Sequence, residues 1–289
     1  MMKHYLSLLR VHQYVKNFFI FLPLFFGMEL FHIHHLVKTG IAFAFFSLTA
    51  SGVYIFNDYC DREDDRKHPV KKDRPLASGA ISSQTALIIM VVLVTAGLAG
   101  SFAIDWRAFI IVLVYIAVNA IYTLALKHLA IIDVMVIAVG FVLRLFVGSV
   151  VADVPLSMWI IIMTFLLALF LAFAKRRDDV ILYLDKGEKM RKVIDGYNID
   201  FLNVAMVIMA AVIIISYVMY TISPEILKRP HGRETYLTVI WVILGILRYI
   251  QLSFVYNETA SPTKVLLTDR FLQGVIAAWL ISFAVLIYL

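Results

Sequence analysis

The chain consists of long apolar runs separated by short, strongly charged connections. Each run has about 20 mainly hydrophobic residues, which suits a helix that crosses a bilayer and exceeds what a barrel strand needs. We expect nine spans, at about 15–32, 37–57, 83–104, 107–125, 131–151, 156–174, 200–222, 235–256 and 268–288. The pattern therefore predicts an all-α, multi-pass membrane protein.

Composition agrees with this fold class. Hydrophobic residues make up 62% of the 289 residues and charged residues 16%, whereas soluble proteins average about 45–50% and about 25%. No Pro-, Gly- or Ser-rich linker interrupts the chain, so we expect one domain over residues 1–289. The single cysteine, Cys60, excludes an internal disulfide and a cysteine-based zinc site. We expect no removable signal peptide, because no apolar stretch near the N-terminus precedes a small-residue cleavage site.

The basic residues favour one orientation. Most of the 26 lysines and arginines fall in the connections that share a side with the N-terminus. The positive-inside rule then places the N-terminus in the cytoplasm and the C-terminus outside, in a plasma or inner membrane. We expect membrane lipids as partners and no nucleic acid, and the sequence leaves a homo-oligomer open.

An acidic cluster follows the second run. Asn57, Asp61 and Asp65 are spaced i, i+4, i+8, and Asp58 precedes Asp61 by three residues. On a helix this spacing stacks the side chains on one face, about 5–6 Å apart. Carboxylates that close repel one another unless a cation joins them, and Mg²⁺ prefers oxygen ligands and often bridges carboxylates to phosphates. We therefore predict that Asp58, Asp61 and Asp65 are catalytic and bind Mg²⁺, with Mn²⁺ as the alternative ion.

Basic residues follow the acids in the same connection. Pro69 and Pro75 stop helix propagation, so Lys71 and Arg74 can reach back toward whatever the metal holds. Acids with nearby bases suit a diphosphate, whose charge a metal and cations neutralise as it leaves. The alternative is a solvated loop that only obeys the positive-inside rule. We interpret the connection as a cytoplasmic diphosphate site.

A second charged segment follows the sixth run. It begins with Lys175, Arg176 and Arg177 and continues with Asp178 and Asp179. These bases are candidates for binding a second anionic group, and a helical continuation would let Asp179 pair with Lys175 or Arg176. The alternative is an ordinary stop-transfer cluster.

Two arginines lie inside apolar runs. Arg144 follows Asp133 by three helical turns, so both are candidates to line one cavity, and Arg248 lies in the eighth run. A charge at membrane depth needs a partner or water. The alternative for each arginine is a structural ion pair or snorkelling to the interface.

Further polar residues border the runs near the proposed site. Lys16 precedes the first run, and Tyr122 and Lys127 lie at the end of the fourth. We consider all three as substrate-binding candidates, with surface anchoring as the alternative for Lys16. We interpret His32, His34 and His35 as an exposed loop on the outer side rather than a metal site.

The acidic pattern resembles a known motif. Asn57-Asp58-x-x-Asp61-x-x-x-Asp65, followed by RPLASG at 74–79, is similar to the first aspartate-rich motif of the UbiA superfamily of membrane prenyltransferases. The resemblance implies nine transmembrane helices around a central cavity, a lateral opening to lipid, and Mg²⁺-dependent handling of a diphosphate.

The resemblance extends to one branch of that superfamily. The second D-x-x-x-D motif is absent, because Leu182 and Tyr183 stand four residues after Asp178 and Asp179. The Lys-Arg-Arg cluster in its place, together with HQYVKN at 12–17, HPVK at 68–71, LKH at 126–128, GFVLR at 140–144 and DRFLQ at 269–273, resembles the phosphoribosyltransferase branch. His12 is a minor departure from that pattern. The branch implies transfer of 5-phosphoribosyl from phosphoribosyl diphosphate to a decaprenyl-like polyprenyl phosphate.

The resemblance also implies roles for the candidate residues. Asp58, Asp61 and Asp65, helped by Asn57, bind Mg²⁺, and Lys71 and Arg74 assist the leaving diphosphate. The cluster at 175–177 binds either the C5 phosphate or the lipid phosphate, and Asp179 holds a ribose hydroxyl or orients a base. Two alternatives stay open: a prenyltransferase for a quinone, haem or lipid acceptor, and a transporter of a phosphorylated metabolite.

Overall fold

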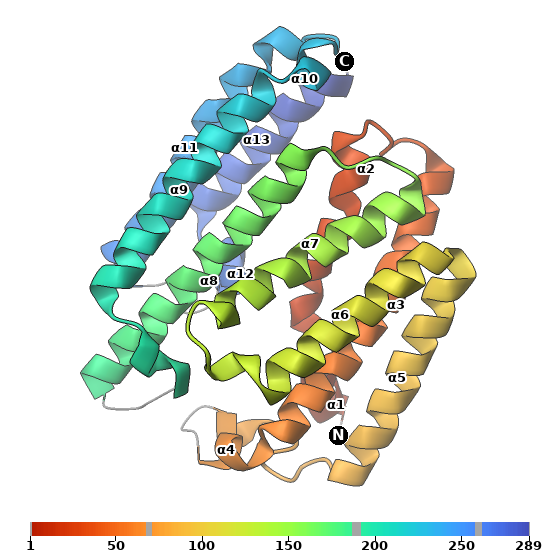
Figure 1. Ribbon diagram of the computed structural model, residues 1–289, viewed down its shortest axis with the longest axis vertical. Coiled ribbons are helices and arrows are strands. Elements are labelled where there is room, and N and C mark those ends of the chain that lie inside the picture. Colours follow the sequence, from red (N-terminus) through yellow and green to blue (C-terminus); the bar gives the residue numbers. More distant parts are fainter. Residues whose placement is uncertain (1, 68–70, 187–191, 258–261, 289) are drawn as a thin grey trace. The chain divides into compact units, whose positions relative to one another are not determined.

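The computed structural model describes residues 2–67, 71–186, 192–257 and 262–288, and every regular element in these ranges is a helix. The chain divides into two compact units, Met1–Leu156 and Ser157–Leu289. Each unit has its own helices and its own core, so the two are described separately (Figure 1).

The first unit is built around one long helix, α3, which packs against α5, α6 and α7. Its elements are α1 (Met2–Leu9), the 3-10 helix η1 (Val11–Phe21), α2 (Leu22–Phe26), α3 (Ile33–Cys60), α4 (Arg62–Arg66), η2 (Lys71–Asp73), α5 (Ser83–Ile104), α6 (Trp106–Leu124), η3 (Leu126–His128) and α7 (Ile132–Ala152).

Small residues let these helices approach closely. A Cβ added at Gly97 on α5 would lie 2.1 Å from Thr49 Oγ1 on α3, and one at Gly148 on α7 would lie 1.9 Å from the carbonyl oxygen of Ile20. Both contacts are too short for any side chain. Membrane helices associate through such close backbone packing. Here it fixes α3 against α5 and η1 against α7.

The second unit contains three long neighbouring helices, α9, α11 and α13, together with α8 (Figure 1). Its elements are α8 (Met158–Lys186), η4 (Lys192–Gly196), α9 (Ile199–Thr221), α10 (Pro224–Leu227), η5 (Gly232–Thr238), α11 (Val239–Phe254), α12 (Pro262–Thr268) and α13 (Arg270–Tyr288). The Trp279 indole donates to Tyr217 Oη at 2.7 Å, and Tyr217 also bonds Thr238 Oγ1 at 2.7 Å. This chain of hydrogen bonds ties α13, α9 and η5 together inside the unit.

Eight of the nine expected spans are continuous helices in the described ranges, long and apolar enough to cross a membrane. The first, expected at 15–32, differs: it is divided between η1, α2 and a loop. Pro23 in the first turn of α2 has no backbone N–H to donate to a preceding carbonyl. Met28 then adopts φ 64° and ends the segment. The first span is therefore shorter and less regular than its hydrophobicity predicts.

Candidate functional site

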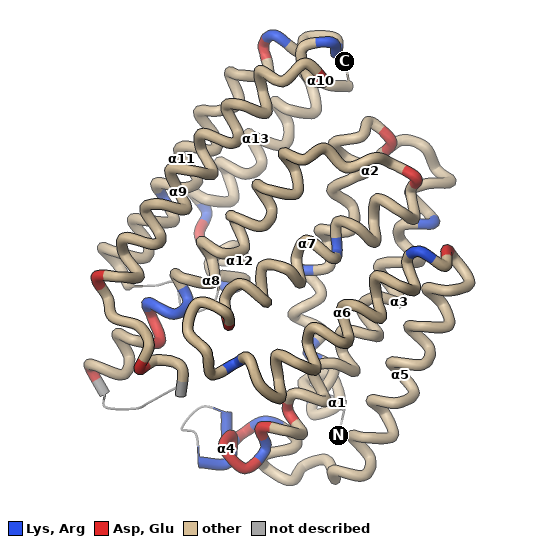
Figure 2. The backbone as a smooth tube through the Cα atoms, viewed as in Figure 1, with Lys and Arg blue, Asp and Glu red and all other residues tan. Residues whose placement is uncertain are grey.

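The acidic cluster lies where α3 passes into α4. Asp61 ends the first helix and begins the second, and its N–H donates to the Asn57 carbonyl at 3.0 Å. The Asp65 N–H donates to the Asp61 carbonyl at 2.8 Å. Hydrogen bonds from residue i+4 to residue i therefore continue through the junction and keep the polar side chains together, as the spacing predicts. Figure 2 shows acidic and basic residues crowded around α4 at this end of the first unit.

Asp58 and Asp65 share one guanidinium. Arg74 Nη1 donates to Asp58 Oδ1 at 2.9 Å and to Asp65 Oδ2 at 2.7 Å. Both aspartates are only 3% exposed. A carboxylate buried to this extent needs charge-assisted partners, because desolvation disfavours its ionised form. Arg74 thus supports both aspartates from the connection that follows them in the sequence.

Arg74 is held by a compact turn. Its N–H donates to the Lys71 carbonyl at 3.0 Å, and its own carbonyl accepts from the Ser78 N–H at 2.8 Å. Leu76 and Ile81 pack against Leu8, Ile55 and Ala86 and anchor the turn to the helices. Lys71 therefore lies in the same turn as Arg74 and is half-buried. His68, Pro69 and Val70, which belong to the predicted motif, lie outside the described residues.

Arg10 is a site residue that the sequence pattern did not identify. It pairs with Asp58 Oδ1 through Nη2, and its guanidinium lies 5.2 Å from the centre of the Tyr54 ring. The residue adopts φ 50° in the turn between α1 and η1. That turn is fixed by Ser51 Oγ, which donates to the Leu9 carbonyl at 2.8 Å. The sequence offered only an ordinary basic residue near the N-terminus, and nothing local separates it from Lys3.

Asp61 belongs to a separate set of contacts. It pairs with Lys127 in η3 and accepts a hydrogen bond from Asn57 Nδ2 at 3.3 Å. Asn57 Oδ1 in turn accepts from Thr123 Oγ1 on α6 at 3.2 Å. The structure thus brings the predicted residues Asn57, Asp61 and Lys127 together and adds Thr123. Tyr122, the neighbour of Thr123, is half-buried on α6.

The donor set suits a hard divalent cation. Arg74 shows that one positive centre can bridge Asp58 and Asp65, and carboxylate oxygens are the ligands that Mg²⁺ prefers. In the described part of the chain, the ligand atoms of all three aspartates do not lie within 4.8 Å of one another. The side chains as they stand therefore form a bridged pair, Asp58 with Asp65, and a neighbouring carboxylate, Asp61.

His12 follows Arg10 by two residues. Burial, together with the positive charges of Arg10 and Lys16, lowers the pKa of the His12 imidazole. Lys16 itself is half-buried on η1.

Arg144 is surrounded by protein partners. Its Nε donates to Asn17 Oδ1 at 2.8 Å, its Nη1 to the Gly140 carbonyl at 2.6 Å, and its Nη2 to Tyr115 Oη at 3.4 Å. Its guanidinium also lies 5.0 Å from the centre of the Phe46 ring. These contacts favour the structural alternative for Arg144.

Asp133 does not form an ion pair with Arg144. The two residues are eleven positions apart on α7, which corresponds to about 16 Å along the helix axis. That separation exceeds the combined reach of the two side chains. Asn17 is buried, and its side chain bonds both Arg144 and Ser47.

The basic cluster of the second unit lies on α8, which continues to Lys186, well past the expected end at 174. Arg176 is 1% exposed and its Nη1 donates to Asp179 Oδ2 at 3.2 Å. This is the i, i+3 pair that a helical continuation predicts. Lys175 is half-buried one position earlier.

Arg177 has a different environment. Its guanidinium donates to Asn203 Oδ1 at 2.8 Å, to the Ser253 carbonyl at 2.5 Å and to Asn257 Oδ1 at 2.9 Å. These bonds join α8 to α9 and to the end of α11. The geometry therefore favours a structural part for Arg177 and leaves Lys175, Arg176 and Asp179 as the better candidates for substrate contact.

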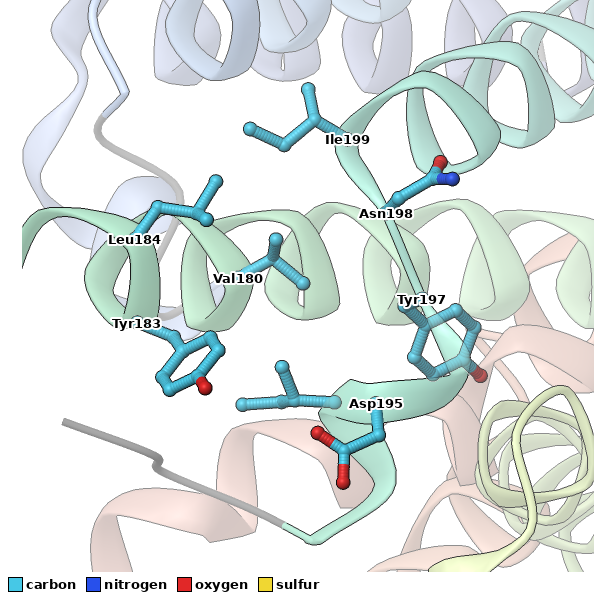
Figure 3. Close-up of a pocket in the computed structure, with 8 residues that line it drawn as sticks. Val180, Tyr183, Leu184, Asp195, Tyr197, Asn198 and Ile199 are labelled. Carbon is cyan, nitrogen blue, oxygen red and sulfur yellow. The ribbon is translucent and has the colours of Figure 1, made fainter. Parts of the chain in front are cut away.

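A small pocket of about 240 Å³ lies along the next turns of α8 (Figure 3). It is lined by Val180, Tyr183, Leu184, Ile194, Asp195, Tyr197, Asn198 and Ile199. Among the residues that the structure describes, the lining is mostly apolar and contains a carboxylate but no lysine or arginine. It does not suit a phosphate group, so we do not assign the anion site there.

Comparisons with known proteins agree with the motif. The model of the UbiA prenyltransferase family matches residues 19–189. A decaprenyl-phosphate phosphoribosyltransferase from Mycolicibacterium smegmatis is 31% identical, covering 96% of this chain and 91% of the relative. A protein of the same name from Corynebacterium glutamicum is 30% identical, covering 97% and 86%.

The fold is also similar to that of a solved structure. A UbiA homolog from Archaeoglobus fulgidus, bound to GPP and Mg²⁺, has a TM-score of 0.71 and 20% sequence identity, covering 99% of this chain and 100% of that chain. With a family model that covers more than half of the chain and relatives that cover nearly all of it, this chain belongs to the UbiA prenyltransferase family and is a membrane-embedded transferase.

Proposed function

We propose that this protein transfers a 5-phosphoribosyl group from phosphoribosyl diphosphate to a polyprenyl phosphate and releases diphosphate. The observation that carries the proposal is the charge of α8, where Lys175 and the buried Arg176 stand in place of a second acidic motif. A phosphoribosyl donor has a C5 phosphate besides its diphosphate, and the lipid acceptor brings another phosphate. Three anionic groups require more cationic ligands than a prenyl diphosphate and a neutral ring do.

Two relatives support the same assignment. Both are named decaprenyl-phosphate phosphoribosyltransferase, and each is aligned with nearly the whole of this chain. At about 30% identity the names support the class of donor and acceptor.

The acidic cluster is the proposed diphosphate site. Asp58, Asp61 and Asp65 would hold Mg²⁺, the ion bound to the Archaeoglobus homolog. Mg²⁺, when bound, neutralises charge on the diphosphate oxygens. Arg74, and Lys71 in the same turn, stabilise the departing diphosphate, since cations at a developing anion lower the barrier.

The remaining candidate residues would bind the acceptor phosphate and the phosphoribosyl group. Lys175 and Arg176 bind the C5 phosphate or the lipid phosphate, and Asp179 orients Arg176 through their 3.2 Å contact. An oxygen of the acceptor phosphate forms the new bond to ribose C1 as the bond from C1 to the diphosphate oxygen breaks. The acceptor phosphate is already ionised at neutral pH, so the reaction needs no strong general base.

Tyr122 and Lys127 would contact substrate at the same end of the first unit as Asp61, which pairs with Lys127. Lys16, on η1, is a further candidate for substrate contact. We place the N-terminus and the acidic cluster on the cytoplasmic side, where soluble phosphorylated donors are found. The polyprenyl tail would lie in the membrane, against the apolar faces of the helices.

The assay uses purified protein in nanodiscs with Mg²⁺, radiolabelled phosphoribosyl diphosphate and decaprenyl phosphate. We expect a labelled lipid that carries phosphoribose, and none when EDTA is present. A parallel reaction offers geranyl diphosphate with an aromatic acid. A prenylated acid in that reaction, with no lipid-linked phosphoribose in the first, would favour the prenyltransferase alternative. Uptake of the donor into proteoliposomes without turnover would favour a transporter.

A further inference from the structure

The end of α3 opposite the acidic cluster carries a second group of metal-type side chains. Glu29 lies in the loop before α3, His32 caps the helix, and His35 lies in its first turn. Their ligand atoms all lie within 4.8 Å of one another. With 28 residues, α3 separates this group from Asp58 and Asp61 by about 40 Å. Figure 1 shows α2 and α4 at opposite ends of the first unit.

One carboxylate oxygen is the centre of the group. Glu29 Oε2 lies 2.6 Å from His32 Nδ1 and 3.0 Å from His35 Nδ1. Both imidazoles thus present the same nitrogen to the same oxygen. Around a tetrahedral Zn²⁺, with bonds of about 2.0–2.2 Å, neighbouring ligand atoms are about 3.3–3.5 Å apart. A shift of less than about 1 Å in these side chains would admit such an ion.

The backbone holds the three residues in this arrangement. The His32 N–H donates to the Glu29 carbonyl at 3.1 Å, and the Glu29 N–H donates to the Leu24 carbonyl at 2.9 Å. Leu30 and Leu36 pack against a buried cluster of Leu24, Ala152 and Val154. The loop and the first turn of α3 are therefore anchored on the core, and the ligand spacing does not depend on an unsupported loop.

We propose that Glu29, His32 and His35 form a binding site for a divalent transition metal of the Zn²⁺ class. Imidazole with a single carboxylate suits such ions, whereas Mg²⁺ prefers an all-oxygen set. The site is distinct from the acidic cluster in position and in ligand chemistry. Its three protein ligands leave further coordination positions to water. The bound ion would link the loop after α2 to the first turn of α3, at the end of α3 opposite the acidic cluster.

The experiment uses full-length protein purified through a tag without histidine and kept in saturating Mg²⁺, so that the carboxylate site is occupied. Co²⁺ is titrated as a spectroscopic probe and then displaced by Zn²⁺. We expect one Co²⁺ per chain, visible ligand-field absorption, and its loss on addition of Zn²⁺. E29Q, H32N and H35N each weaken binding at least about tenfold. H34A is the matched control, an exposed histidine on the same turn, and leaves binding unchanged.

A second readout guards against variants that fail to fold. Zn²⁺ raises the thermal unfolding midpoint of the wild type, because a ligand that binds only the folded state stabilises it, and EDTA reverses the effect. The midpoint of H35N does not respond to Zn²⁺, although its metal-free midpoint matches that of the wild type. Absent or unsaturable Co²⁺ absorption, wild-type affinity in E29Q and H35N, or equal loss in H34A overturns the proposal.

Discussion

Arg10 and Asp58 lie 48 residues apart in the sequence and form an ion pair between the turn after α1 and the last turn of α3. Asp58 is almost completely buried, whereas Arg10 retains 20% side-chain exposure. The pair therefore connects the N-terminal segment directly to the acidic cluster. It extends the candidate site beyond the motif that identifies the family.

Replacing Arg10 tests this extension. We expect R10Q to lower kcat/KM for phosphoribosyl transfer by about tenfold to a hundredfold, because a buried carboxylate that loses a cationic partner is costly. R10K should recover part of the activity. R107Q is the control, since Arg107 pairs with Asp105 at the other end of the first unit. Full activity in R10Q would show that the contact is dispensable.

The bridged pair of carboxylates predicts metal dependence. D58N and D65N should each abolish detectable turnover and raise the Mg²⁺ concentration needed for half-maximal donor binding. D64N provides the control, because Asp64 is exposed on the same short helix, α4. The measurement is donor binding and turnover as functions of Mg²⁺ concentration. An unchanged Mg²⁺ dependence in D58N would contradict the assignment of the cluster.

Arg176 and Arg177 are adjacent, yet their contacts predict different defects. R176Q should raise KM for one of the phosphorylated substrates at least about tenfold, because it removes a cation that would bind a phosphate. R177Q should lower the unfolding midpoint, because it removes the hydrogen bonds that Arg177 donates to Asn203, Ser253 and Asn257. Both midpoints and both KM values are measured in nanodiscs. The reverse result would exchange the two roles.

The Arg144 network predicts a loss of stability. R144M removes the hydrogen bond to Oδ1 of the buried Asn17, and a buried acceptor without a donor costs about 1–3 kcal/mol. Thermal unfolding in detergent measures the loss. In the double variant N17L/R144M the destabilisation should be smaller than the sum of the single effects, because the two residues share one hydrogen bond. Strict additivity would indicate that the network is not coupled.

Asp269 predicts a dependence on pH in the second unit. Hydrogen bonds from Arg248 hold the pKa of the Asp269 carboxyl below its usual range. A lowered pKa means that the ionised form stabilises the folded protein. This contribution is complete above the unfolded-state pKa of about 3.9 and is lost as pH falls through the lower folded-state value.

The variant D269N separates this effect from general acid denaturation. At pH 6 it should unfold at a lower temperature than the wild type, since it loses the pair with Arg248. The difference should shrink as the pH falls below about 4, where Asp269 of the unfolded chain becomes protonated, and should vanish below the lower pKa of the folded state. A constant difference between pH 6 and pH 3 would mean that another group controls the acid transition.

Much of this protein follows from local pattern. Apolar runs of about 20 residues predict spanning helices, because the bilayer sets the helix length. The spacing of Asn57, Asp61 and Asp65 predicts their proximity, because helical hydrogen bonding continues through the junction of α3 and α4. Hydrophobicity could not predict that the first span is divided into η1 and α2, because it does not register the missing N–H of Pro23.

Other features depend on which helices pack together. Arg10 reaches Asp58 across 48 residues, and Arg144 reaches Asn17 across 127. Likewise, only the folded loop turns Glu29 toward His32 and His35, which the sequence suggested were merely exposed. Composition and short spacing were enough to predict the membrane fold, the family and the acidic motif, because each of these is a local property of the chain. The pairing of each cation with its carboxylate required the folded helices, because long side chains find their partners only after distant segments are in contact.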